Sequence, residues 1–267
     1  MSSPLEALQT HFGYATFRSE QEAIIQSVLQ KNDTFVLMPT GGGKSLCYQI
    51  PALLFDGLTV VVSPLIALMK DQVDALRVNG IAAAYLNSSQ THQEQNHIIS
   101  AVRDQNLKLL YLAPESNFLN QIGSFNISLL AIDEAHCISH WGHDFRPEYL
   151  TLAKWKRNLS QVPVIALTAT ADKLTRKDIL EKLELKQPNT FISSFNRANI
   201  RYKVEPKRKS FNKLLDFLHN RTDESGIIYC LSRAATESLA TDLKEAGYNE
   251  LPYHAGLERD QRARHQE

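Results

Sequence analysis

Short apolar runs alternate with longer segments of helical periodicity along most of the chain. The runs that predict buried strands are residues 34–38, 59–63, 82–86, 109–112, 128–132 and 164–167. Helices are predicted between them, including residues 65–78 and 172–183. Regular alternation of strand and helix is typical of a doubly wound α/β fold with a parallel sheet.

The first thirty residues predict two helices, separated by residues 13–18. Ser19 and Glu22 have the spacing of a capping box, with Ser19 as the N-cap of the second helix. This arrangement places Tyr14, Arg18 and Gln21 close together, just ahead of the first strand. A ring or guanidinium face can stack on a base, and a side-chain amide can bind the edge of that base. Taken alone, this segment is equally explained by a capped surface helix without a ligand.

A second α/β unit is predicted to begin near residue 206. Its signals are a helix at 211–219, a strand at 226–230, a helix at 233–246 and a strand near Tyr253. The two predicted strands are fewer than the about five or six strands of a usual sheet. The sequence therefore predicts one domain over residues 1–205 and a second, incomplete one over residues 206–267.

Composition and charge add little to this picture. The 267 residues include 29 Lys plus Arg and 29 Asp plus Glu, so net charge neither favours nor excludes a nucleic-acid partner. No run approaches the roughly 20 apolar residues of a membrane span, and the N-terminus lacks signal-peptide organisation, which favours a cytoplasmic protein. Three scattered cysteines, at positions 47, 137 and 230, are expected to be reduced and buried.

A glycine run follows the first predicted strand and ends in Lys-Ser. Glycines permit a tight turn whose N–H groups point inward at an anion, and the following helix adds its positive end. Lys44 would reach the terminal phosphates of a nucleotide, and the Ser45 hydroxyl would ligate magnesium. The residues of this predicted phosphate loop are Thr40, Gly41, Gly42, Gly43, Lys44 and Ser45.

Two adjacent carboxylates end the buried strand at residues 128–132. Asp133 is placed to hold a magnesium ion shared with the nucleotide, and Glu134 to orient or deprotonate the attacking water. With Lys44, they form a nearly complete set for phosphoryl transfer, which depends mainly on positioning and charge neutralisation. The hydroxyls of Thr168 and Thr170, at the end of another strand, are placed to link the water-binding carboxylate to the rest of the site.

The segment from Ser139 to Tyr149 is rich in aromatic residues and histidine. Trp141 and Phe145 predict an exposed platform on which nucleic-acid bases stack, with ordinary packing as the alternative. A second alternative is zinc, although its candidate ligands fit no regular metal-binding spacing. Those candidates are His136, Cys137, His140 and His143.

Seven basic residues and one acid lie between Arg197 and Lys213. This run has two open interpretations, a stripe that contacts phosphates or a solvated linker.

These motifs together resemble the RecQ family of DNA helicases, over the whole chain. The resemblance rests on residues 12–18 with Gln21, the Thr-Gly-Gly-Gly-Lys-Ser loop, Asp133-Glu134-Ala135-His136 and the segment 139–149. It implies a RecA-like P-loop NTPase domain that binds ATP and Mg²⁺, with adenine held by Tyr14, Arg18 and Gln21. Trp141, Phe145 and Arg146 match the family's aromatic-rich loop, which couples DNA binding to ATP hydrolysis. Most relatives have Gln or Glu at the position of His140.

The resemblance further implies a 3′ to 5′ helicase that acts on single-stranded and partly duplex DNA in repair and recombination. Such a protein would be nucleoid-associated in bacteria or nuclear in eukaryotes. The family's arginine finger and zinc-binding domain would follow residue 267, so this chain alone is expected to bind ATP weakly and not to unwind DNA. Alternatives are an RNA helicase of the Asp-Glu-Ala-His type and a non-catalytic DNA-binding fragment.

Overall fold

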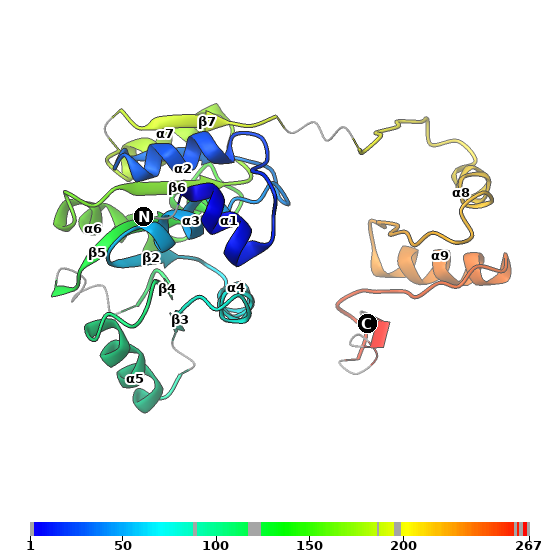
Figure 1. Cartoon of the computed structure of the whole chain (residues 1–267). Coiled ribbons are helices and arrows are strands. Elements are labelled where there is room, and N and C mark those ends of the chain that lie inside the picture. The colour runs from blue at the N-terminus through cyan, green and yellow to red at the C-terminus, as the bar shows by residue number, and fades with distance from the viewer. Residues whose placement is uncertain are drawn as a thin grey trace. The chain divides into compact units, whose positions relative to one another are not determined.

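The chain divides into two compact units, Met1–Ile200 and Arg201–Glu267. The computed structural model describes residues 3–87, 90–116, 124–185, 187–194, 199–258, 261 and 264–265 (Figure 1). Among these residues, no helix combines the length and apolar character needed to cross a bilayer.

A seven-stranded sheet forms the centre of the first unit, and all of its neighbouring strands are parallel. The strand order is β3-β4-β2-β5-β6-β1-β7. The strands are β1 Thr34–Leu37, β2 Leu58–Val62, β3 Ala83–Leu86, β4 Leu109–Leu112, β5 Ile127–Ile132, β6 Val164–Thr168 and β7 Asn189–Ile192. The predicted fold class, a RecA-like doubly wound sheet, is confirmed.

Helices cover both faces of the sheet, and alternate side chains of each strand divide the core between them. Val36 and Met38 pack toward one face, whereas Phe35 and Leu37 pack toward the other. The first face is covered by α2 Gln21–Leu29, α3 Leu46–Leu54 and α4 Ile66–Val78, with α1 Pro4–Phe12 packed outside α2 and α3. The second is covered by α5 His92–Arg103, the 3₁₀ helices η2 Ala135–Ile138 and η3 Pro147–Thr151, α6 Leu152–Asn158 and α7 Lys173–Lys182.

Asp33 joins three segments at the amino end of the sheet. Its carboxylate accepts hydrogen bonds from the Lys156 ammonium at 2.7 Å and from the Val164 backbone at 2.9 Å. Its carbonyl accepts from the Asn189 backbone at 2.9 Å, at the start of β7. The sequence pattern does not predict β7, because most of its residues are exposed and its pairing with β1 joins distant segments of the chain.

The predicted capping box at Ser19 and Glu22 is wrong. Helix α2 begins at Gln21, and its N-cap position, Glu20, makes no side-chain capping bond. The Gln21 side chain instead accepts a hydrogen bond from the Arg18 backbone at 2.8 Å, which organises the turn ahead of the helix. Complete capping boxes occur elsewhere, at Ser3 with Glu6 and at Thr91 with Glu94.

The second unit contains α8 Ser210–Leu218 and α9 Arg233–Glu245, as predicted, but no strand within its described residues 201–258, 261 and 264–265. The predicted strands at 226–230 and near Tyr253 are therefore wrong for this structure. Tyr229 is 91% exposed and Leu231 98% exposed, since β-prone residues need neighbouring strands before they are buried. Leu243 is the one buried residue in the same described part of this unit.

The basic run is partly neutralised within itself. Glu205 pairs with both Lys203 and Lys213, and hydrogen bonds from these two lysines lower the pKa of Glu205 to about 2. Arg197 lies outside the described residues. Both interpretations of this run stay open.

Of the cysteines, Cys47 and Cys137 are buried as predicted, whereas Cys230 is half-buried.

We expect the second unit to open far more readily than the first, because it buries so little apolar surface. Backbone amides of α8 and α9 should exchange with deuterium within minutes at neutral pH, while those of β2 and β5 should stay protected for hours. Peptide-resolved hydrogen exchange measures both in one sample. Equal protection of α9 and β5 would contradict this expectation.

Candidate nucleotide and nucleic-acid site

The phosphate loop connects β1 to α3 and requires glycine at several positions. Gly41 and Gly43 both have φ of 79°, in the left-handed region that side chains disfavour. A Cβ on Gly42 would lie 2.6 Å from the Met38 side chain and 2.9 Å from the Pro39 carbonyl. The loop is therefore as tight as the sequence predicts.

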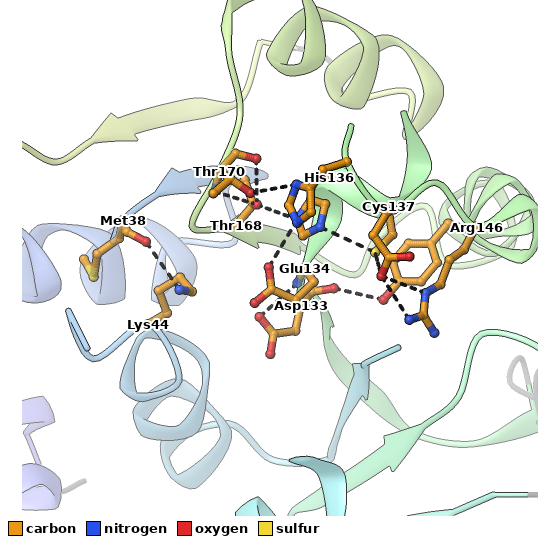
Figure 2. Close-up of polar contacts among 12 residues, drawn as sticks. Met38, Lys44, Asp133, Glu134, His136, Cys137, Arg146, Thr168 and Thr170 are labelled. Carbon is orange, nitrogen blue, oxygen red and sulfur yellow. Dashed lines mark hydrogen bonds and ion pairs between the residues drawn. The ribbon is translucent and has the colours of Figure 1, made fainter. Parts of the chain in front are cut away.

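Lys44 lies inside this loop. Its ammonium donates a hydrogen bond to the Met38 carbonyl at 3.3 Å, and Figure 2 shows it on the side of the loop that faces Asp133 and Glu134. A single long bond leaves the ammonium able to bind an anion. Ser45 follows immediately and precedes the first residue of α3, so it stands at the positive end of that helix.

The structure brings Tyr14, Arg18 and Gln21 together, as predicted. The Arg18 guanidinium lies 5.7 Å from the centroid of the Tyr14 ring, which is half exposed. Gln21 is buried, and its amide donates to the carbonyl of Gly43 at 3.1 Å and of Gly42 at 3.5 Å. Sequence reasoning missed this contact between Gln21 and the phosphate loop. The adenine-binding role of the three residues stays a prediction.

Asp133 is a buried carboxylate at the carboxyl end of β5, only 9% exposed. Its backbone is fixed on both sides, because its N–H donates to Val62 at 2.9 Å and its carbonyl accepts from the Tyr149 hydroxyl at 3.0 Å. Burial, followed by the charge of Glu134, raises the pKa of Asp133 to about 6. The Lys44 charge opposes this rise. A bound cation would stabilise the ionised form of this buried carboxylate.

Glu134 has a left-handed backbone, with φ of 46° and ψ of 47°, which is strained for a non-glycine residue. Its carboxylate lies 3.2 Å from His136 Nδ1. That hydrogen bond holds the pKa of Glu134 below its usual value, although partial burial acts in the opposite direction. Glu134 therefore gives up its proton more readily than Asp133 does.

A chain of contacts runs from Glu134 to the aromatic-rich segment (Figure 2). The Nδ1 atom of buried His136 also lies 2.9 Å from Thr168 Oγ1, which in turn accepts from the Thr170 N–H at 3.2 Å. Thr170 Oγ1 contacts His143 Nδ1 at 3.4 Å. The His143 and His136 rings stack with their centroids 4.3 Å apart.

The two threonine hydroxyls thus have the linking position that the sequence predicts. From the sequence pattern, His136 and His143 are candidates only for zinc ligation, and their part in this chain of contacts is not predicted. Among the described residues, no group of three His, Cys, Asp or Glu side chains has the arrangement of a metal site. Unlike zinc, magnesium fits the residues present, because the Asp133 carboxylate and the Ser45 hydroxyl are the hard oxygen donors that it prefers.

The three coupling candidates of the aromatic-rich segment differ in exposure. Trp141 is 69% exposed. Phe145 is half-buried, so the prediction of an exposed ring is wrong for this residue. Its ring packs against His140, at a centroid distance of 3.8 Å, and the Lys182 ammonium lies 5.8 Å from the Phe145 centroid. No local sequence pattern predicts this contact, because Lys182 lies in α7, far along the chain from Phe145.

The Arg146 guanidinium is hydrogen-bonded to two other residues of the chain. Its guanidinium donates to the Asp144 carboxylate at 3.0 and 3.2 Å and to the Pro64 carbonyl at 2.6 Å. Pro64 follows β2, so Arg146 ties the aromatic-rich segment to the loop between β2 and α4. The coupling roles of Trp141, Phe145 and Arg146 stay predictions.

Comparison with known proteins identifies the family. Residues 18–179 match the model of the DEAD/DEAH box helicase family. The ATP-dependent DNA helicase RecQ of Pasteurella multocida is 52% identical over 262 residues, which are 97% of this chain and 42% of that protein. The protein of the same name from Bacillus subtilis is 43% identical, over 97% of this chain and 45% of its own length. The chain therefore spans less than half the length of these relatives.

Solved structures agree on the fold. The DUF1998 helicase MrfA, bound to DNA and AMPPNP, matches with a TM-score of 0.69 at 17% identity, over 99% of this chain and 41% of that one. At this identity the likeness concerns the fold alone. On the family model and the sequence relatives together, the chain belongs to the DEAD/DEAH box helicase family and, within it, to the RecQ family.

Proposed function

We propose that this chain is the first motor domain, with part of the second, of an ATP-dependent DNA helicase. The helicase would move 3′ to 5′ on single-stranded DNA and unwind duplexes during repair and recombination. In this assignment the first domain spans residues 1–205 and the part of the second spans residues 206–267. The observation that carries the proposal is the continuous contact from Glu134 through His136 and His143 to the exposed Trp141 segment.

The residues divide the work of hydrolysis. Lys44 binds the terminal phosphates, while the N–H groups of the glycine loop hold the phosphate chain. Ser45 and Asp133 would hold magnesium, which when bound neutralises charge on the phosphates. Glu134 remains ionised and orients a water molecule for attack, and His136 fixes the position of its carboxylate.

The names of two relatives support DNA as the nucleic acid that the proposed helicase binds. The relatives from Pasteurella multocida and Bacillus subtilis are both called ATP-dependent DNA helicases. Trp141 offers an exposed ring for stacking on bases without sequence preference. An RNA helicase of the Asp-Glu-Ala-His type would share the nucleotide site. A comparison of ATPase stimulation by single-stranded DNA and by RNA of equal length tests this point, and stimulation by RNA alone would overturn the proposal.

Lys44→Ala should remove DNA-stimulated ATP hydrolysis in a protein that carries both motor domains. In the present chain it should weaken nucleotide binding about tenfold or more, because a charge-assisted bond to phosphate is lost. Single-stranded DNA binding should be retained. Lys70→Ala, at an exposed position of α4, is the matched control and should change neither property. Hydrolysis at the wild-type rate in the Lys44 variant would refute the phosphate-binding role.

Magnesium-dependent nucleotide binding should weaken as the pH falls through 6. Protonated Asp133 cannot ligate the ion, and a pKa of about 6 leaves this carboxyl mostly ionised at pH 7 and mostly protonated at pH 5. The expected loss over that interval is about tenfold, measured by fluorescence titration with N-methylanthraniloyl-ADP in the presence of magnesium. Asp133→Asn should bind weakly at both values. An unchanged pH dependence in this variant would assign the titration to another group.

Trp141→Ala should lower DNA-stimulated ATPase much more than basal ATPase in the protein with both motor domains. A lost base stack is worth about 1 to 3 kcal/mol of DNA binding. The melting temperature should stay nearly constant, since the ring is largely exposed. Leu174→Ala, which removes another exposed apolar side chain, serves as the control. If both activities and the melting temperature fell together, Trp141 would be a packing residue.

A further inference from the structure

Residues 138–145 form a closed loop within the aromatic-rich segment. The Arg146 N–H donates a hydrogen bond to the Cys137 carbonyl at 2.8 Å, which joins the two ends of this loop. Inside it, the Trp141 N–H donates to the Ser139 hydroxyl at 3.2 Å. The backbone that carries the exposed Trp141 ring is therefore ordered by hydrogen bonds of its own.

The start of the loop is held from outside by a lysine of α7. The Lys182 ammonium donates a hydrogen bond to the Ile138 carbonyl at 3.1 Å. Ile138 is the last residue of η2 and is completely buried. The last carbonyls of a helix have no partner within that helix, and a buried carbonyl without a hydrogen bond is costly. Lys182 therefore satisfies a backbone group at the point where the loop leaves η2.

The same ammonium lies near the other end of the loop. It is 5.8 Å from the centroid of the Phe145 ring, a distance at which a cation is attracted to an aromatic face. That ring also packs against His140, at a centroid distance of 3.8 Å. One side chain of α7 thus contacts both ends of the loop between which Trp141 lies.

Lys182 is itself fixed in place. Its ammonium forms an ion pair with Asp178, one turn earlier in α7, at 3.0 Å, and the two side chains are only 24% and 19% exposed. Ile179 and Leu183 of the same region are buried in the core, so α7 cannot shift without disturbing that core. Lys177, in contrast, points from the same helix into solvent and is 74% exposed. Lys182 therefore has an environment that a solvating surface lysine does not need.

An ordered loop binds DNA at a lower cost than a loop that must become ordered on binding. Without the Lys182 ammonium, part of this cost would fall on DNA binding. The carboxylates of the site depend on other contacts. The Asp133 carbonyl is held by the Tyr149 hydroxyl, and the Glu134 carboxylate lies against His136. Loss of the ammonium should thus weaken DNA binding and leave hydrolysis itself intact.

We propose that Lys182 is a positioning residue for DNA binding, which holds the loop 138–145 on α7 and keeps the Trp141 ring in place to stack on a base. This inference rests on the proposed function, because it requires Trp141 to contact DNA. Lys182 acts through the loop and not by its own contact with DNA, since its ammonium is engaged with Ile138 and Asp178.

The test uses Lys182→Met in the protein with both motor domains. Methionine keeps an unbranched side chain of similar length and removes the ammonium. ATP turnover is measured while oligo(dT) is added. We expect the DNA concentration for half-maximal stimulation to rise about three- to tenfold, the range of one lost hydrogen bond, while turnover without DNA and at saturating DNA is unchanged. An unchanged half-maximal concentration, or a fall in turnover without DNA, would overturn the inference.

Lys177→Met is the matched control, since it removes the same charge from the same helix at an exposed position. Its half-maximal DNA concentration should stay at the wild-type value. A rise equal to that of Lys182→Met would show a general effect of charge on DNA binding and would overturn the inference.

Salt dependence distinguishes positioning from direct contact with a phosphate. Affinity for fluorescein-labelled oligo(dT) is measured by anisotropy at several salt concentrations. A lysine that binds a phosphate contributes about one unit to the slope of log affinity against log salt. Lys182→Met should lower the affinity and keep the wild-type slope. A slope reduced by about one unit would mean that Lys182 contacts DNA itself, and the inference would be wrong.

Trp141→Ala separates the inference from the proposed function. In the Trp141→Ala background, Lys182→Met should cause little further loss of DNA affinity, because the ring that Lys182 keeps in place is gone. Fully additive losses would overturn the inference alone. If Trp141→Ala leaves DNA affinity unchanged, the DNA-binding role of Trp141 fails and the inference fails with it. If Trp141→Ala lowers the affinity but Lys182→Met does not, that role stands and the inference fails.

Discussion

Burial of the Asp133 carboxylate is the constraint on which the candidate site depends. A charge removed from water is costly unless cations or hydrogen bonds compensate, and here burial raises the pKa of Asp133 to about 6. The ammonium of Lys44 and the ring of His136 lie close enough to oppose that rise. Partial compensation leaves the site short of positive charge. A magnesium ion bound together with a nucleotide would supply positive charge beside Asp133.

Around this carboxylate, distant segments of the chain are joined by a few polar contacts. The Tyr149 hydroxyl binds the Asp133 carbonyl, and Arg146 joins the same 3₁₀ region to Pro64. Pro64 leads into α4, whose Gln72 accepts a hydrogen bond from the Gln49 amide of α3, the helix that follows the phosphate loop. The loop after β2, the aromatic-rich segment and the phosphate loop therefore share a continuous framework. A displacement of one has a direct physical route to the others.

The sequence was most informative where side chains respond to their own strand or turn. Continuous apolar runs located six strands, because a parallel sheet covered on both faces needs them, and the glycines and the Asp-Glu pair located the site. It was least informative where a contact joins distant segments. The stacking of Phe145 on His140 beside Lys182 and the binding of Gln21 to the phosphate loop depend on tertiary packing. The strand predicted at 226–230 is wrong for a related reason. Its β-prone residues have no partner strand among the described residues of the second unit and stay exposed.

The edge strand β7 has a mechanical consequence. Among the described strands, it pairs with β1 alone. Just beyond it, the Ser193 N–H donates to the Leu37 carbonyl at 2.9 Å, and the Ser193 hydroxyl donates to Glu20. The two strands are parallel, so β7 and β1 both end at the carboxyl edge of the sheet, where the phosphate loop begins. Because β1 runs directly into the phosphate loop, the pairing with β7 fixes one side of the strand that positions this loop. Detachment of β7 would leave β1, the strand that leads into the phosphate loop, paired on one side only, with β6.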